Sequence, residues 1–182
     1  WGQGGKPRLP SFQETFGLRA AAITAVDLIR GIALSIGWKI IQVPGATGYI
    51  DTNYRGKGEA AAAALDEMDM IVVHVEAPDE AGHNGDAANK VKAIEQIDEH
   101  VVGPLLNKLK TFDAWRILIA PDHPTPVVKK THSAVPPPFC MVGTGVVCDR
   151  SERFSEAQAE ESGLRIDPGY ELMEYFLKSG KA

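Results

Sequence analysis

The chain has 182 residues, of which 44% are apolar and 24% are charged, and its formal net charge at pH 7 is −5. This length and composition allow a single domain with a substantial hydrophobic core. Lys and Arg are scattered along the chain, which argues against a nucleic-acid surface, and no apolar run approaches the roughly 20 residues of a membrane span.

The first half of the chain predicts strands that alternate with helices. Three apolar runs have the length and composition of buried strands: residues 19–24, 38–43 and 69–75. Residues 25–36 carry apolar side chains at helical spacing, and Gly37 would end that helix. The alanine-rich residues 59–68 are strong helix formers. Between these elements we expect residues 45–58 to form a long polar loop.

Residues 86–110 predict the longest helix of the chain. Its apolar positions fall on one stripe, opposite charged residues: Val91, Ile94, Val101, Leu105 and Leu109. Gly103 and Pro104 interrupt this pattern, and proline removes a helical hydrogen bond and crowds the preceding turn. We therefore expect the helix to be bent or divided at this pair.

The C-terminal third predicts two more strands and a last helix. The strands are the apolar runs at 115–120 and 138–142. The acid-rich residues 151–162 are typical of a mobile polar segment. Asp167 and Pro168 have the residue types of an N-cap and a first helical position. The apolar residues of this last helix are expected to pack on the sheet: Leu172, Met173, Phe176 and Leu177.

Strands joined by helices of ten or more residues favour crossover connections and a parallel sheet between helix layers. We therefore predict one α/β domain over residues 1–182, with three layers (αβα) and a mainly parallel sheet.

Cys140 and Cys148 are too few for a disulfide framework and lie outside any metal-binding spacing. We expect both to be reduced, with Cys140 inside a strand, in a cytoplasmic protein.

Acidic and histidine residues follow the third and the fourth predicted strand. Asp79 and His83 come shortly after the third strand, Asp122 and His123 come directly after the fourth, and His132 lies further along. Ligands of open α/β sheets bind beyond the carboxyl ends of the strands, so these five side chains are expected to converge there. Mixed Asp and His ligands suit Mn²⁺, Zn²⁺ or Fe²⁺, and paired divalent metals are used to hold phosphoryl groups.

Each of these residues also has a simpler interpretation. Asp79 would serve as the cap of a short helix, and Asp122 as the stabiliser of a turn before Pro124. A single loop histidine is more often a solvated polar residue than a metal ligand. The ordered combination at two strand ends favours a metal site over these alternatives. His74, inside the third strand, is interpreted as a core or outer-sphere residue, and His100 as a solvated one.

Three stretches of the chain resemble the alkaline-phosphatase superfamily, and more closely its archaeal-type, cofactor-independent phosphoglycerate mutases. They are residues 75–86 (VEAPDEAGHNGD), 120–126 (APDHPTP) and 131–139 (THSAVPPPF). Shorter stretches are similar to the same family: 1–4 (WGQG), 11–14 (SFQE), 25–31 (AVDLIRG) and 43–54 (VPGATGYIDTNY). The resemblance implies an alkaline-phosphatase-like fold and a glycolytic isomerase that does not use 2,3-bisphosphoglycerate.

The resemblance also implies how the five residues are divided. Asp79, His83 and His132 would hold one metal, and Asp122 and His123 the other. Two open catalytic metals need roughly seven or eight ligands between them, so five are too few. The family completes the second site with an N-terminal Asp and with the nucleophilic Ser or Thr that carries the phosphate. We therefore expect the chain, which starts at Trp1, to be the C-terminal part of a longer enzyme.

On this interpretation the missing part also contains the N-terminal strands and an inserted lid domain. The fragment itself is expected to be inactive, since Ser11 and Ser35 do not lie at a strand end beside the metal cluster. The expected metals are two divalent ions, Mn²⁺ first, with Zn²⁺, Co²⁺ or Mg²⁺ as alternatives. Substrate-binding residues are not identified. The expected substrate is phosphoglycerate, with no nucleic-acid or membrane partner, and an exposed sheet edge would allow homo-oligomers.

Two other reactions are compatible with the same metal ligands. A homoserine kinase-like phosphotransferase would pass the phosphate to or from another alcohol, and a phosphatase would let water accept it. The absence of a Walker-type glycine loop weakly disfavours an ATP-dependent kinase. A non-enzymatic binding module is the weakest alternative, because no binding role requires these five side chains together.

Overall fold

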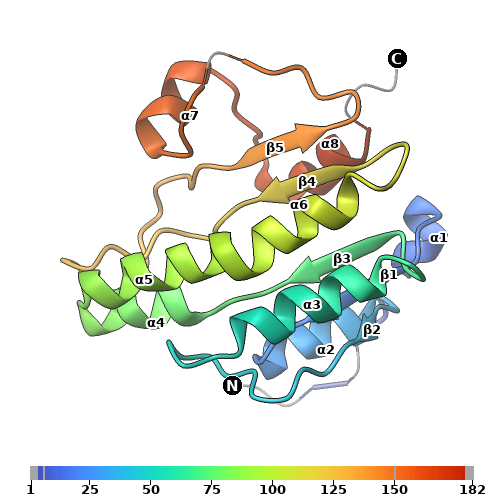
Figure 1. Cartoon of the computed structure of the whole chain (residues 1–182), viewed down its shortest axis with the longest axis horizontal. Coiled ribbons are helices and arrows are strands. Elements are labelled where there is room, and N and C mark those ends of the chain that lie inside the picture. The colour runs from blue at the N-terminus through green and yellow to red at the C-terminus, as the bar shows by residue number, and fades with distance from the viewer. Residues whose placement is uncertain (1–3, 6, 150, 179–182) are drawn as a thin grey trace.

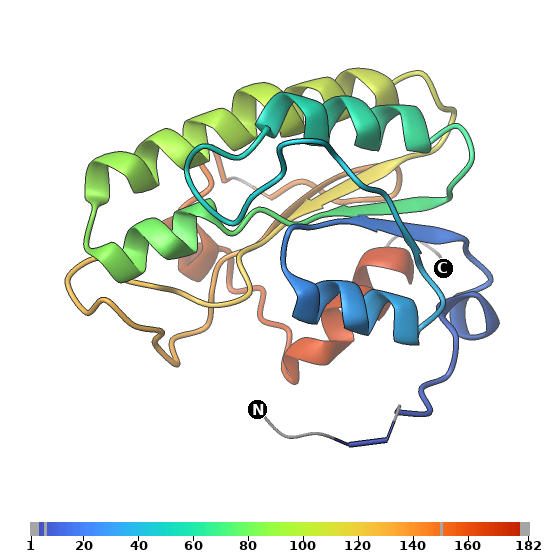
Figure 2. The same ribbon diagram turned by 90° about the horizontal axis from the view of Figure 1, so that it is seen from below.

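The structure, a computed structural model, describes residues 4–5, 7–149 and 151–178. The strands form a central layer between two layers of helices (Figures 1 and 2). One face is covered by α3 (Tyr54–Ala64), α5 (Ala87–Ile97) and α6 (Gly103–Leu109), and the other by α2 (Asp27–Ser35) and α8 (Leu172–Lys178). The predicted three-layer α/β fold is confirmed. Trp1, where the resemblance to the mutases begins, lies outside the described residues.

Three of the strands form a parallel sheet in the order β2–β1–β3. Their bounds are Ala20–Ile23 for β1, Lys39–Ile40 for β2 and Met70–Val73 for β3. The other two, β4 (Arg116–Ile119) and β5 (Cys140–Gly143), pair antiparallel. No helix interrupts the segment between β4 and β5. Parallel neighbours need a long crossover, usually helical, whereas an antiparallel return does not, which accounts for the change of direction at β5.

The core lies on both faces of the central strand β1, whose four residues are all buried. On one face, Phe12 of α1 (Phe12–Phe16) clusters with Ala20 and Met70. Three residues of α8 pack against this cluster, as the sequence predicts: Met173, Phe176 and Leu177. A second cluster consists of Tyr54, Ala77 and Ala93. The small side chains of β1 allow helices to approach the sheet closely from either side.

Helix α3 begins at Tyr54, earlier than the predicted start at residue 59. The Asn53 side chain accepts a hydrogen bond from the Gly56 amide at 2.8 Å, which satisfies one of the free N–H groups of the first turn. A capped turn therefore forms where the sequence predicts a loop. Gly58 is required further along, because a Cβ there would overlap the carbonyl oxygen of His100 on the facing helix.

The predicted long helix is divided, and the division is a change of helix type and not only a bend. A π-helical segment, Asp98–Val102, separates α5 from α6, directly before Gly103 and Pro104. The predicted apolar stripe is wrong for its first half. Val91 and Ile94 are 56% and 53% exposed, whereas Ala93 is buried. The change of helical pitch rotates the buried face, so that Val101 and Leu109 are buried as predicted but the earlier stripe is not.

Two predictions near the C-terminus are also wrong. The expected mobile segment contains α7 (Glu156–Ser162), which is capped by Ser155. Pro168 is not the first residue of a helix: its backbone is extended, and it precedes a 3-10 turn over Gly169–Glu171 that leads into α8. No helix of the described chain is both long and apolar enough to cross a membrane.

Candidate metal centre

Helix α4 (Ala77–Asn84) carries two of the predicted metal ligands at the carboxyl end of β3. From the sequence, Asp79 was considered only as the cap of a short helix, but the helix begins earlier, so that Asp79 lies inside it. Pro78 occupies the first turn, where its missing N–H is tolerated, and Gly85 ends the helix with φ 72°. Asp79 and His83 are therefore one helical turn apart, and side chains at this spacing share a face. Because β3 and β4 run in the same direction, α4 and the segment after β4 meet at one end of the molecule (Figure 1).

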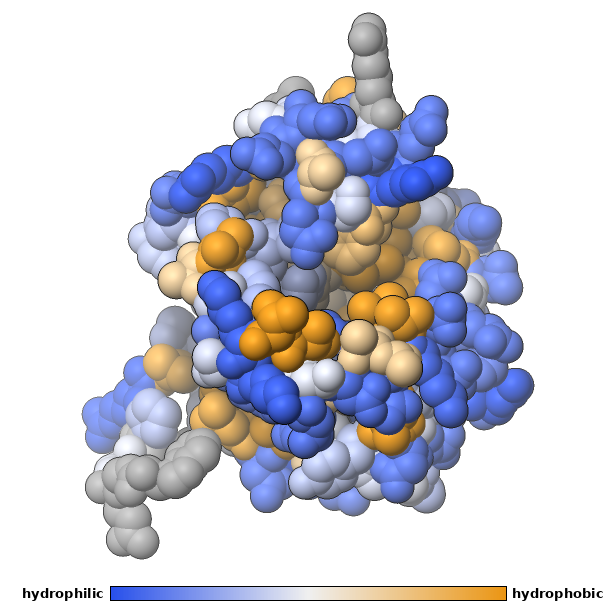
Figure 3. Space-filling view, turned by 90° about the vertical axis from the view of Figure 1, so that its left-hand side faces the viewer, coloured by the Kyte–Doolittle hydropathy of each residue, from blue (hydrophilic) through white to orange (hydrophobic). Residues whose placement is uncertain are grey.

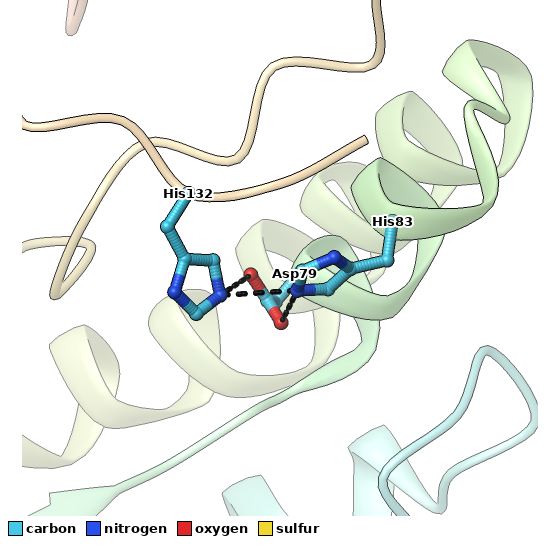
Figure 4. A group of neighbouring side chains, drawn as sticks. All are labelled: Asp79, His83 and His132. Carbon is cyan, nitrogen blue, oxygen red and sulfur yellow. Dashed lines mark hydrogen bonds and ion pairs between the residues drawn. The ribbon is translucent and has the colours of Figure 1, made fainter. Parts of the chain in front are cut away.

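Asp79, His83 and His132 converge on a common point (Figure 4). The Nε2 atom of His83 lies 3.2 Å from Asp79 Oδ2 and 3.0 Å from His132 Nε2. The Nε2 atom of His132 lies 3.6 Å from Asp79 Oδ1. Bonds of about 2.0–2.1 Å to a tetrahedral metal place neighbouring ligand atoms about 3.4 Å apart. The separations and the donor types thus fit a divalent ion such as Zn²⁺ or Mn²⁺.

The orientation of the His83 ring is set by a backbone contact from a distant loop. Its Nδ1 lies 3.1 Å from the carbonyl oxygen of Lys130. An Nδ1–H that donates to a carbonyl leaves Nε2 with a free electron pair, as in most metal-binding histidines. Lys130 has φ 54°, a left-handed conformation that is unfavourable for a residue with a side chain. This conformation directs its carbonyl group toward His83.

Asp122 and His123 lie beside the first three residues, as predicted. The His123 ring stacks on that of His132 with centroids 3.7 Å apart, and its Nδ1 is 4.0 Å from Asp79 Oδ1. Its Nε2 is 3.2 Å from Asp122 Oδ2. The structure therefore brings all five predicted residues together. Among the described residues, however, only the group of Asp79, His83 and His132 has three mutually close donors.

Thr125 joins the two halves of this cluster, and the sequence analysis did not identify it. It is 4% exposed, and its hydroxyl donates to Asp79 Oδ1. The same oxygen lies 3.3 Å from His123 Nδ1, so it can accept the Nδ1–H and leave Nε2 free. Gly82 on α4 makes the approach possible, since a Cβ there would lie 2.5 Å from the Thr125 carbonyl oxygen. The only signal in the sequence is the position of Thr125 between two prolines.

A second polar chain runs from β1 to the edge of the site. The amide of Val26 donates to Thr24 Oγ1, which lies 3.1 Å from His74 Nδ1. His74 Nε2 lies 3.2 Å from Glu76 Oε2, and a carboxylate oxygen accepts, so a neutral His74 carries its proton on Nε2 and its Nδ1 accepts the Thr24 hydroxyl. Burial lowers the pKa of His74. Burial, and then the charges of Asp79 and Asp122, raises the pKa of Glu76.

The location of His74 agrees with the interpretation of a core or outer-sphere residue, but Glu76 is an acidic neighbour that the sequence analysis overlooked. The surface at this end of the molecule is hollowed, with apolar side chains beside the hollow and hydrophilic ones around it (Figure 3). A separate cavity of about 160 Å³ lies against α4, lined partly by Tyr49, Glu80 and Asn84. None of the five predicted ligands lines that cavity.

The chain matches the family model described as Metalloenzyme superfamily over residues 1–169. It is 49% identical over 174 residues to the 2,3-bisphosphoglycerate-independent phosphoglycerate mutase of Methanothrix thermoacetophila, covering 95% of this chain and 44% of that protein. It is also 49% identical over 179 residues to the probable 2,3-bisphosphoglycerate-independent phosphoglycerate mutase of Geobacter sulfurreducens, covering 97% and 45%. The chain thus spans less than half the length of these relatives.

Two solved structures are similar to the chain. The PH0037 protein of Pyrococcus horikoshii superposes with a TM-score of 0.80 at 32% identity, covering 87% of this chain and 48% of that one. The cofactor-independent phosphoglycerate mutase of Thermoplasma acidophilum superposes with a TM-score of 0.68 at 22% identity, covering 96% and 40%, and so shows a shared fold. The resemblance and the fold class inferred from the sequence motifs are confirmed.

Proposed function

Because this chain belongs to the metalloenzyme superfamily, we propose that it is the metal-binding part of a phosphoglycerate mutase. The reaction is the interconversion of 3-phosphoglycerate and 2-phosphoglycerate without 2,3-bisphosphoglycerate. The observation that carries the proposal is the convergence of Asp79, His83 and His132 within a segment 49% identical to proteins named as such mutases. A mutase of this kind would act in the cytoplasm.

We assign the five clustered residues to two divalent metal sites. Asp79, His83 and His132 hold one ion, and Asp122 and His123 contribute to the other. Mn²⁺ is the first candidate, with Zn²⁺, Co²⁺ or Mg²⁺ as alternatives that the Asp and His donor set also accepts. When bound, such ions would neutralise phosphoryl charge and lower the pKa of an attacking hydroxyl.

The nucleophilic hydroxyl is proposed to lie outside this chain, in the part of the longer relatives that it does not cover. Ser11 and Ser35 are occupied elsewhere. Ser11 accepts the Glu14 amide at 3.1 Å as the cap of α1, and the Ser35 hydroxyl donates to the Gly31 carbonyl at 2.7 Å. The role of this chain in the reaction is then to hold the metals in place, through the Lys130 carbonyl at His83 and the Thr125 hydroxyl at Asp79.

The proposal is tested by ³¹P NMR of 3-phosphoglycerate with Mn²⁺-loaded enzyme. Two proteins are compared: the 182-residue chain, and a longer gene product that contains it. We expect a 2-phosphoglycerate resonance with the longer protein and none with the 182-residue chain. Free phosphate in place of 2-phosphoglycerate would establish a phosphatase. Conversion by the 182-residue chain alone would contradict a nucleophile outside it. No observation on the structure favours the phosphatase or the kinase-like reaction over the mutase.

A further inference from the structure

Lys57 is the largest side chain that is fully buried in the described part of the chain, at 0% exposure. It lies on α3, between Gly56 and Gly58, and its ammonium donates to the carbonyl oxygen of His74 at 3.2 Å. An ammonium removed from water is costly unless a carbonyl or an opposite charge compensates it. A fully buried lysine near the end of β3 therefore indicates that its charge has a function that an apolar side chain could not perform.

The compensating charge is Glu76. Burial lowers the pKa of Lys57 to about 8, and the negative charge of Glu76 opposes that shift. Glu76 in turn lies among acidic neighbours: burial is the first cause that raises its pKa, and the charges of Asp79, Asp122 and Glu80 raise it further. Lys57 is thus a buried cation near this concentration of carboxylates, and His123 also opposes the rise in the pKa of Glu76.

Glu76 also connects Lys57 to the helix that carries the candidate ligands. The Glu76 carbonyl accepts the amides of Asp79 at 2.8 Å and Glu80 at 3.2 Å, which begins α4. The Glu76 carboxylate meets His74 Nε2 at 3.2 Å, and the His74 carbonyl is the acceptor of Lys57. The Lys57 ammonium thus contacts His74 in the turn between β3 and α4, and it lies close enough to Glu76 for the two charges to interact.

We propose that Lys57 is a positioning residue for the metal centre. Its ammonium ties α3 to the end of β3 and offsets the charge of Glu76, so that the turn leading into α4 holds Asp79 and His83 in ligand geometry. Lys57 is too deeply buried to touch a substrate. The inference rests on the proposed function only in requiring that the site binds a metal, and it is independent of which substrate reacts.

The test is the affinity of the 182-residue chain for Mn²⁺, measured by isothermal titration calorimetry, with far-UV circular dichroism to follow the fold. We expect Lys57→Met to weaken Mn²⁺ binding by about tenfold or more, as is typical when a group behind the ligands is removed. The matched control is Lys108→Met, which removes a lysine from an ion pair with Asp66 away from the site. That variant should bind Mn²⁺ as the wild type does.

The charge balance is tested separately with Glu76→Gln, alone and combined with Lys57→Met. If the two residues act as a unit, each single variant and the double variant should lose a similar tenfold in Mn²⁺ affinity, rather than a hundredfold in the double. If Lys57→Met does not fold, the Mn²⁺ affinity of Glu76→Gln tests the proposal instead, because this variant removes the charge that Lys57 offsets. A folded Lys57→Met or Glu76→Gln variant with wild-type Mn²⁺ affinity would overturn the proposal. A wild-type chain that binds no Mn²⁺ would instead refute the metal centre itself.

Discussion

The Nε2 atoms of His83 and His132 lie 3.0 Å apart, although 49 residues separate the two in the sequence. His83 reaches this point from a helix and His132 from the loop after β4. With the Nδ1 of His83 next to the Lys130 carbonyl, its Nε2 presents an electron pair to His132 and to Asp79. Electron-pair donors that face each other at this distance are best accommodated around a cation.

Removing a member of this group should abolish metal binding without unfolding the chain. Asp79→Ala or His132→Ala is expected to weaken Mn²⁺ binding more than about 100-fold, since even residues behind the ligands cost 10–100-fold. Calorimetric titration measures the affinity, and circular dichroism follows the fold. Asp66→Ala, on the surface away from the site, is the control. In a longer active enzyme the same variants should lose turnover, and unchanged turnover would mean that the first metal site is misassigned.

The hydroxyl of Thr125 is expected to matter more than its methyl group. Thr125→Val keeps the shape but removes the donor to Asp79, so metal affinity should fall by about tenfold. Thr125→Ser keeps the hydroxyl and should stay close to the wild type. The same calorimetric titration distinguishes the two. Equal affinities for the valine and serine variants would show that the contact with Asp79 does not orient the carboxylate.

Gly58 should not tolerate a side chain, whereas Gly31 should. A Cβ at Gly58 would overlap the His100 carbonyl oxygen, which belongs to the backbone and has little room to shift. We expect Gly58→Ala to lower the free energy of unfolding by about 1–3 kcal/mol. A Cβ at Gly31, on α2, meets nothing within 4 Å, so Gly31→Ala should raise it by roughly 0.5–1 kcal/mol. Urea denaturation gives both values, and an equally stable Gly58→Ala would contradict the close packing of α3.

The burial of Lys57 predicts how stability varies with alkaline pH. Its pKa is about 8 in the folded chain instead of the usual 10.5, so the folded state holds the ammonium proton less tightly than the unfolded state. Below pH 8 the Lys57 side chain is protonated in both the folded and the unfolded state, so the folded state bears the full free-energy cost of burying the ammonium. Between about pH 8 and 10.5 the folded state releases the proton first, and the cost is relieved by about 3 kcal/mol at most, at 1.36 kcal/mol per pKa unit.

Relative to Lys57→Met, the wild-type chain should therefore become more stable as the pH rises through this window. Urea denaturation of both proteins at pH 7 and pH 10 measures the change, and the comparison cancels the groups that they share. A constant difference between the two proteins would show that the pKa of Lys57 is not lowered.

Much of the architecture follows from local patterns in the sequence. The apolar runs around Ala21, Val72 and Leu118 predict strands because their residues suit a sheet buried on both faces. The rule that ligands bind beyond strand carboxyl ends then places Asp79, His83, Asp122 and His123 at one edge. Residue type and order alone are sufficient for these inferences, and the resemblance to the mutases rests on the same segments.

Other features depend on contacts that no local pattern encodes. The contact of Asp79 with the Thr125 hydroxyl depends on the close approach of α4 to a distant segment, which Gly82 permits. The orientation of His83 depends on the carbonyl of Lys130, which lies 47 residues away in the sequence. The burial of Lys57 is likewise not predictable from the local sequence, because a lysine between two glycines is expected to be solvated. Only the path of the chain brings its ammonium under the end of β3, since burial and charge balance are properties of neighbours in space.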